Sequence, residues 1–239
     1  MMQYIAIGSI NVEVVKKNIK NMHLAVYPPN GRVRLAAPVD VNDETIKLYT
    51  ISKLAWIKRQ QRKFEQQDRQ SERKYIQRES HYFLGKRYLL KVAEKNARPL
   101  VQVKNKTYLE IQVRPGATTE QKHHFINEWY RTQLKTMLPA LIDKWERKMG
   151  VAVEEWGVKQ MKTKWGTCNT DKQKIWLNLE LAKKPIHCIE YILVHEMVHL
   201  LERKHNDVFQ AYMDKYLPNW RTLKDELNKL PVSHIDWEY

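Results

Sequence analysis

Cysteine, glycine and long apolar runs are all scarce in this 239-residue sequence, which has 2 Cys and 7 Gly. Two cysteines cannot build a disulfide framework, so we expect reduced thiols in a cytoplasm. A membrane-spanning helix needs about 20 consecutive apolar residues, and the sequence has no such run. We expect no signal peptide, because Met1–Ile5 is not a charged head followed by a long apolar core. These absences favour a cytoplasmic globular protein.

Acidic residues are also in short supply, since 42 Lys and Arg face 27 Asp and Glu, a net charge of +15. Such an excess favours polyanions or acidic partners. Many of the basic residues lie between Lys53 and Lys74 and between Lys86 and Arg98. The motifs of helix-turn-helix, zinc-finger and RNA-recognition modules are absent. A nucleic-acid or nucleotide partner therefore stands beside a plainer interpretation, a solvated helix surface.

The most informative segment is His195–His199, which reads H-E-M-V-H. The residues before it, Pro185 to Val194, contain no Gly and no internal Pro, and apolar residues recur at three- and four-residue steps. This pattern predicts a buried helix. Residues four apart share a helix face, so His195 and His199 can direct two imidazoles at one ion. The spacing suits Zn²⁺, and Glu196 can then take a proton from water.

A catalytic zinc site needs three protein ligands and an open position. We expect His205 to be the third ligand, because Asn206 or Asp207 can cap a new helix and leave His205 in the turn between two helices. Glu202, three residues after His199, is the alternative. Cys168 as a fourth ligand would close the site, so we expect a buried small hydrophobe at a tight turn there, and Cys188 in the core.

Several motifs together carry a family resemblance, although none does so alone. They are Lys164–Cys168 (K-W-G-T-C), Ile175–Asn178, the H-E-x-x-H segment, His205, Tyr216–Arg221, Asn30–Pro38 and Leu84–Tyr88. In combination they resemble the YgjP-like metallopeptidases, relatives of the SprT-like zincins, from about Leu24 to Arg221. Thr167 stands where the family usually has Ser, a departure that keeps the hydroxyl.

The resemblance implies that His195, His199 and His205 hold zinc and that Glu196 is the catalytic base of a peptidase. In zincin folds the strand before the active-site helix borders the cleft, where an extended peptide or protein substrate can pair with it.

Ile175–Leu179 is the expected edge and Trp165–Cys168 its neighbour. We expect Trp165 and Trp176 to pack in the core. A transition-state donor besides the metal is expected, and Tyr212, His124 and Arg221 are the candidates.

Two other function classes stay open. Members of the family are linked to nucleotide pyrophosphatase activity, and the positive charge suits a triphosphate, although no Walker-type phosphate loop is present. The chain can also be a polyanion-associated zinc-binding module without catalysis. Glu196 argues against that module, because a structural zinc needs no adjacent base. The oligomeric state is left open.

The order of elements predicts an α+β fold with two domains. Residues 1–115 are expected to form a β-rich domain with a long basic helix from about Glu44 to Gln77, whose apolar stripe is Leu48, Ile51, Leu54, Ala55 and Ile57. Residues 116–239 are expected to form a zincin-like domain with a small sheet and the active-site helix. Its first helix is capped at Thr118 or Thr119 and reaches Met149. No internal repeat is visible.

Overall fold

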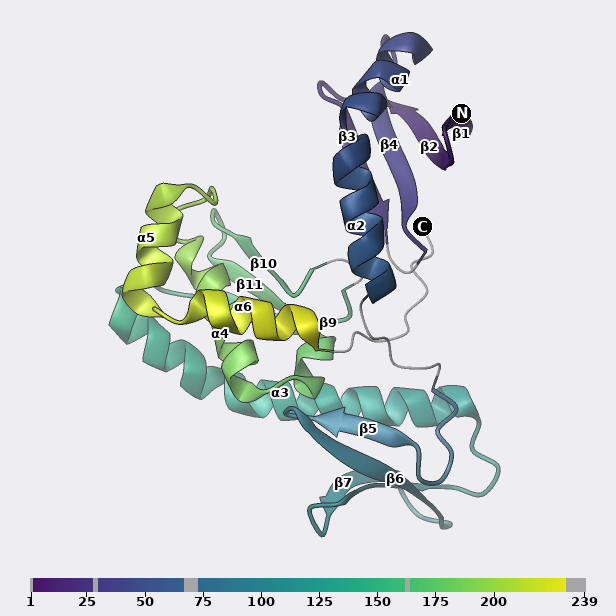
Figure 1. Cartoon of the computed structure of the whole chain (residues 1–239). Helices are drawn as coiled ribbons and strands as arrows, with labels where there is room; N and C mark the ends of the chain where they lie inside the picture. Colours follow the sequence, from purple (N-terminus) through teal and green to yellow (C-terminus); the bar gives the residue numbers. More distant parts are fainter. Residues whose placement is uncertain (1, 28–29, 67–72, 162–163, 231–239) are drawn as a thin grey trace. The chain divides into compact units, whose positions relative to one another are not determined.

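The computed structural model describes residues 2–27, 30–66, 73–161 and 164–230. The chain divides after Gln70 into two compact units, called unit 1 and unit 2 below (Figure 1). Both contain mixed sheets and helices, so the predicted α+β class is confirmed. Among the described residues, no helix is both long and apolar enough to cross a membrane.

Unit 1 is a four-stranded sheet followed by two helices. Its strands alternate apolar and polar residues, and Val12, Val14 and Leu35 lie on the buried face. The β-rich character expected of this part is confirmed, and residues 28 and 29, between the last two strands, lie outside the described residues. The strands are β1 (Met2–Ile7), β2 (Ile10–Lys17), β3 (His23–Tyr27) and β4 (Arg32–Pro38), in the order β1-β2-β4-β3. Only β2 and β4 are parallel to each other.

The long helix predicted from Glu44 to Gln77 is two helices, α1 (Asp43–Ser52) and α2 (Leu54–Gln66), interrupted at Lys53, and residues 73–77 are not helical. The predicted apolar stripe was wrong at Leu48, Ile51 and Ala55, which are exposed. The sheet instead buries Ile46, Thr50 and Ile57, while Leu48 and Ile51 are 63% and 50% exposed. A helix with apolar residues on two faces can dock by either, and propensity alone does not choose between them.

Unit 2 begins with a second sheet of the same topology as the first. Its strands are β5 (Ser80–Phe83), β6 (Lys86–Glu94), β7 (Leu100–Lys104) and β8 (Tyr108–Val113), in the order β5-β6-β8-β7 with only β6 and β8 parallel. In both sheets the second residue of the last strand lies opposite a buried residue: Val33 opposite Val12, and Leu109 opposite Leu90. The backbone arrangement therefore repeats although the sequence shows no repeat, because a sheet register requires only matching apolar alternation.

Helix α3 (Thr119–Met149) follows the second sheet. The predicted cap is confirmed at Thr118, where side chain and backbone form a capping box with Gln121, and the helix continues through Pro139. Residues of β6 and β8 share one hydrophobic core with α3 and the helices after it. The domain boundary expected after residue 115 therefore falls inside unit 2, because the second sheet has no separate core.

The small predicted sheet follows α3. It consists of β9 (Glu155–Lys159), β10 (Gly166–Asn169) and β11 (Lys174–Asn178), in the order β10-β11-β9. The edge beside the site is therefore β10, and the expectation that Ile175–Leu179 is the edge was wrong. Strand β9 pairs with β11 in parallel and occupies its other side.

A 3₁₀ helix, η1 (Leu179–Lys183), leads into α4 (Ile186–Val198), α5 (Asp207–Tyr216) and α6 (Trp220–Lys229). The β5–β6 turn fastens this region to the second sheet. Backbone N–H groups of Leu84 and Gly85 donate to the carbonyls of Ala182 and Lys183 at 2.9 and 3.2 Å. A Cβ on Gly85 would lie 2.7 Å from Cγ of Pro185, so only glycine permits this approach.

Candidate functional site

Helix α4 carries the H-E-x-x-H residues, as the apolar spacing predicts. Pro185 is its N-cap, and His199 follows the last helical residue as the C-cap. Nine of the helix residues are buried, including Met197 and Val198, so the helix is held on several sides. Such burial fixes the direction in which His195 and His199 leave the backbone.

The turn after α4 brings His205 back to the same place. Asn206 caps α5 by accepting a hydrogen bond from the N–H of Phe209 at 3.0 Å, which fixes the residue next to His205. The ring of Phe209 is buried and packs against all three imidazoles, with centroids 4.9 Å from His195, 4.8 Å from His199 and 4.7 Å from His205. The sequence did not indicate these contacts, because they join three separate segments.

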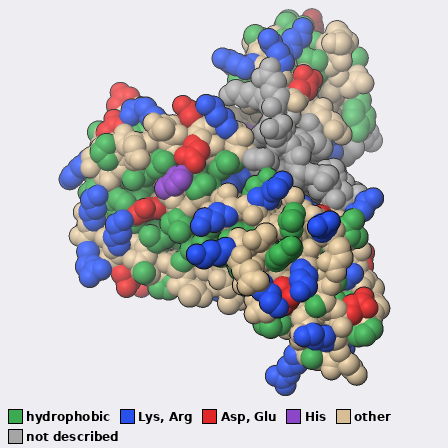
Figure 2. Space-filling model, turned by 60° about the horizontal axis from the view of Figure 1, so that its bottom comes forward, with side chains coloured by type: hydrophobic (Ala, Val, Ile, Leu, Met, Phe, Trp, Pro, Cys, Tyr) green, Lys and Arg blue, Asp and Glu red, His purple; other side chains and the backbone are tan. Residues whose placement is uncertain are grey.

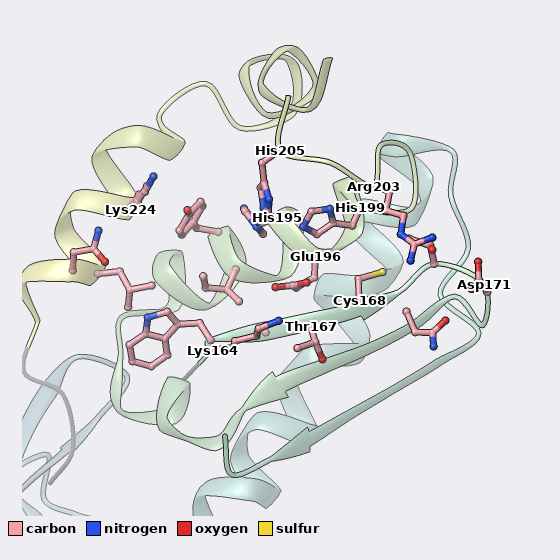
Figure 3. Close-up of a pocket in the computed structure, with 18 residues that line it drawn as sticks. Lys164, Thr167, Cys168, Asp171, His195, Glu196, His199, Arg203, His205 and Lys224 are labelled. Atoms are coloured by element: carbon pink, nitrogen blue, oxygen red, sulfur yellow. Dashed lines mark hydrogen bonds between the residues drawn. The ribbon is translucent and has the colours of Figure 1, made fainter. Parts of the chain in front are cut away.

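The three histidines converge. One ring nitrogen from each of His195, His199 and His205 lies within 4.8 Å of the others, and the Nε2 atoms of His195 and His205 are 2.9 Å apart (Figure 3). Burial, reinforced by His199 and His205, lowers the pKa of His195 to about 3. Its imidazole is therefore neutral near pH 7, with a lone pair available to a cation.

The backbone orients His199. Its Nδ1 lies 3.2 Å from the carbonyl oxygen of Glu202, an arrangement that makes Nδ1 the donor and leaves Nε2 free. The Glu202 carboxylate instead accepts the N–H of Lys204 at 2.9 Å and is not part of the histidine cluster. The geometry thus favours His205 over Glu202 as the third ligand.

Glu196 points across the cleft toward β10 (Figure 3). It is 6% exposed, and this burial raises the pKa of its carboxyl to about 7, opposed by the charge of Lys164. A Cβ on Gly166 would lie 2.7 Å from both Cγ and Oε1 of Glu196. The glycine of the W-G-T-C segment therefore makes room for the carboxylate, a role that the sequence alone did not reveal.

Glu196 and the histidines line a cavity of about 620 Å³ between β10, α4 and α6. Three cations also line it, Lys164, Arg203 and Lys224, and none of them was predicted as a site residue. In Figure 3 Arg203 lies near Asp171 at one end, and Lys224 lies at the other. Their side chains come from three separate segments, so no local spacing could have indicated them.

Asn178 holds the segment that leads into β10. Its amide donates to the carbonyls of Met161 and Lys164 at 2.9 and 2.8 Å, and its Oδ1 accepts from the N–H groups of Met161 and Glu180. A buried side chain with this many partners is held rigidly. Asn178 therefore stabilises the cleft wall from behind and does not line the cleft itself.

The other predictions about the cleft fare differently. Cys188 is fully buried, as expected, but Cys168 lies in strand β10 and lines the cavity rather than a tight turn. Burial and the neighbouring Glu196 raise the pKa of the Cys168 thiol to about 11, so it is protonated and a poor ligand. Trp165 lines the cavity as well, and it is partly buried against the hydrophobic core, as expected. Trp176 instead packs over Gly157, with Lys159 and Lys174 over its ring, and is not among the described residues of that core.

The three donor candidates lie elsewhere. Tyr212 stacks on Tyr216 within α5, Arg221 pairs with Asp214, and His124 lies on α3. None of the three lines the described cavity. On the face drawn in Figure 2, blue Lys and Arg side chains are spread out with red carboxylates among them rather than gathered in one block. A nucleic-acid or nucleotide partner stays a prediction.

Comparison with known proteins assigns the family. No curated protein matches the chain. A solved structure described as the metallopeptidase zymogen of Pyrococcus abyssi abylysin is 19% identical, with a TM-score of 0.36 over 38% of this chain and 91% of that one. The family model described as YgjP-like, metallopeptidase domain matches residues 20–230, which include both cleft walls and all three histidines. The chain therefore belongs to the YgjP-like metallopeptidase family.

Proposed function

We propose that this protein is a zinc-dependent peptidase, with His195, His199 and His205 as metal ligands and Glu196 as the general base. The observation that carries the proposal is the convergence of three imidazole nitrogens within 4.8 Å beside a buried carboxylate. Neutral imidazoles suit zinc, and three protein ligands leave a position open for catalysis. Magnesium and calcium prefer oxygen ligands, so the donor set favours a transition-type metal.

The donor atoms fit such an ion. Among the described residues His195 has no hydrogen-bond partner at its buried Nδ1, and its Nε2 lies 2.9 Å from Nε2 of His205, where a bound ion would accept both lone pairs in place of that contact. When bound, zinc lowers the pKa of a water molecule toward neutrality and polarises a carbonyl group.

Glu196 is the proposed proton acceptor and donor. With a pKa of about 7 its carboxylate can take a proton from the attacking water and return it to the amine nitrogen as the C–N bond breaks. Gly166 keeps the carboxylate close to β10, where a substrate backbone would lie. Lys164 stands on the same wall and can donate to developing negative charge on the carbonyl oxygen.

Strand β10 is the proposed substrate platform. It is the last strand in the order β10-β11-β9, so its outer backbone groups can pair with an extended peptide. Asn178 holds the residues that enter this strand. A peptide paired with β10 would pass in front of Glu196 and the three histidines.

The test is metal content together with turnover. Wild-type protein should bind about one zinc per chain and cleave casein-derived peptides. His205→Ala should lose zinc and activity, and Glu202→Ala should retain both, as a matched change in the same turn. If only Glu202→Ala loses zinc, the third ligand is Glu202 rather than His205. Full activity in metal-free protein would refute the proposal.

A nucleoside triphosphate pyrophosphatase is the second candidate function. The observation in its favour is the set of three cations, Lys164, Arg203 and Lys224, around the cavity. Such a set can offset the charge of a triphosphate. Release of pyrophosphate from a nucleoside triphosphate, without peptide cleavage by the same preparation, would select this function.

We also propose a cytoplasmic location and a peptide or protein partner. Cys168 and Cys188 are free thiols, and a reducing compartment keeps such thiols reduced. Fractionation of cells that express the chain would test the location, and recovery in a secreted fraction would contradict it.

A further inference from the structure

Unit 1 contains a groove that plays no part in the proposed chemistry. It has a volume of about 500 Å³ and lies between strand β3 and the junction of α1 with α2. Leu24 comes from β3, Tyr49 from α1, Lys53 from the interruption between the helices, and Trp56 and Arg59 from α2. Figure 1 shows α2 running beside β3. Both walls belong to unit 1, so the groove is complete within that unit.

In the second sheet, the position that corresponds to this groove is covered by a helix. Leu24 pairs with Leu35, and at the equivalent position of the second sheet Val101 pairs with Ile111. Val101 is 8% exposed beneath a core that includes residues of α3, whereas Leu24 is half-buried and lines the groove. The same backbone arrangement is therefore closed in one copy and open in the other.

One side of the groove is formed by strand β3 at the edge of its sheet. Strand β3 is the last strand in the order β1-β2-β4-β3, and within the described part of the chain no strand pairs with its outer side. Unpaired backbone N–H and C=O groups at such an edge can accept a further strand. The helix on the other side supplies side chains that an added strand would contact, the arrangement by which several domains bind extended peptides.

The walls of the groove combine aromatic and positive side chains. Tyr49 and Trp56 are half-buried, and Lys53 and Arg59 are exposed. Among the residues that the structure describes, no acidic side chain lines the groove. Among the described residues neither cation forms an ion pair, and the ammonium group of Lys53 lies 6.0 Å from the ring centre of Tyr49. This surface is complementary to a segment that carries carboxylates around an apolar side chain.

We propose that this groove binds an extended acidic peptide segment, which pairs with the outer edge of β3 and inserts an apolar or aromatic side chain between Tyr49 and Trp56. Its carboxylates meet Lys53 and Arg59. Each observation supports a different feature of the ligand: the strand edge requires an extended backbone, the aromatic walls an apolar side chain, and the cations an acidic flank. The site is independent of the metal centre.

The experiment measures binding of a fluorescein-labelled peptide, Glu-Glu-Val-Trp-Val-Glu-Glu, to the full chain by fluorescence anisotropy. A Glu196→Gln background prevents cleavage, and a parallel titration contains a chelator. The double variant Lys53→Glu with Arg59→Glu should bind about tenfold more weakly. The double variant Lys47→Glu with Lys58→Glu makes the same charge change at exposed residues outside the groove and should bind within about twofold of the parent.

Two modified peptides keep the test decisive if a variant does not fold. Methylation of alternate backbone nitrogens removes donors for strand pairing and should weaken binding about tenfold. Replacement of every Glu by Gln should weaken it by a similar factor. Equal binding of the methylated peptide would overturn the strand-edge pairing. If the chelator abolishes peptide binding, the peptide occupies the metal cleft, and the groove of unit 1 is not its binding site.

Two competing occupants are outcomes of the same experiment. Polyuridylate that binds through Lys53 and Arg59, in a preparation to which the peptide does not bind, would overturn the proposal in favour of a nucleic acid. Self-association of the chain that the double variant abolishes, measured by sedimentation velocity, would overturn it in favour of a second copy. Peptide binding by a monomeric chain supports the proposal.

Discussion

The helix after the first sheet is interrupted at Lys53, whereas the helix after the second sheet runs without interruption from Thr119 to Met149. The two sheets share strand order and direction. In unit 2 the continuous helix closes one face of the sheet, and the β5–β6 turn fastens η1 and α4 at the strand ends. In unit 1 the interruption leaves a groove. The same sheet arrangement is thus covered by a helix in unit 2, whereas in unit 1 it borders an open groove.

The largest expected effect is on peptide hydrolysis, and it distinguishes the metal cleft from the groove of unit 1. Glu196→Gln should lower peptide hydrolysis by about 10²–10⁴-fold, because an amide cannot accept the proton, while zinc content and peptide binding by the groove stay unchanged. Turnover of a casein-derived peptide measures the hydrolysis, and elemental analysis measures the zinc content. Glu202→Gln, a matched change outside the histidine cluster, should keep full activity, and equal loss in the two variants would contradict the assignment.

Equivalent core positions in the two sheets give the next prediction. Leu35 and Ile111 occupy equivalent positions in the fourth strand and are both 0% exposed. Leu35→Ala and Ile111→Ala should each cost about 2–5 kcal/mol of stability, because each leaves a cavity in a packed core. Hydrogen exchange of the β4 and β8 amides measures each sheet separately. A cost below about 1 kcal/mol in only one sheet would show that the two cores are not equivalent.

A glycine pair tests how the second sheet holds the active-site helix. Gly8→Ala and Gly85→Ala both place alanine at positive φ, +59° and +80°, which costs about 1 kcal/mol. Only at Gly85 does the new Cβ meet Pro185, so Gly85→Ala should cost about 2–3 kcal/mol and also lower hydrolysis. Thermal unfolding and turnover check this. Unchanged turnover in a destabilised Gly85→Ala protein would mean that the turn does not position α4.

The last prediction concerns the pH dependence of stability and the buried Lys184, beside this junction. Burial lowers the pKa of Lys184 to about 8 from its usual 10.5. Between these values the unfolded chain binds more protons than the folded one, so the free energy of unfolding should rise with pH from about 8 to about 10.5. Lys184→Met should lack this rise when denaturant unfolding is compared at both ends of the range. Parallel pH profiles for the two proteins would refute the shift.

The strands and the active-site helix were predictable because their signals are local. Alternating residues such as those of β2 and β8 specify a half-buried strand, and the apolar steps before His195 specify a buried helix. The pair His195 and His199 needed only the helical period. The interruption at Lys53 was missed because α1 offers two apolar faces, and the choice depends on the sheet that it covers.

The site residues divide in the same way. His195, Glu196 and His199 lie within one helix and its cap, so their spacing already placed them together. Gly166, Lys164, Arg203 and Lys224 reach the cleft from strands, loops and α6, and no sequence interval connects them. The edge position of β10 was also missed, since only the pairing of β9 with β11 decides which strand is last.

By itself, the order of residues determined the chemistry that this chain can hold, because two imidazoles and a carboxylate within one helical turn depend only on helix geometry. Tertiary structure decided where that chemistry opens to a substrate and where a second surface stays uncovered. Those outcomes depend on the packing of segments far apart in the chain, where one glycine beside Glu196 or one break at Lys53 sets the shape of a cavity.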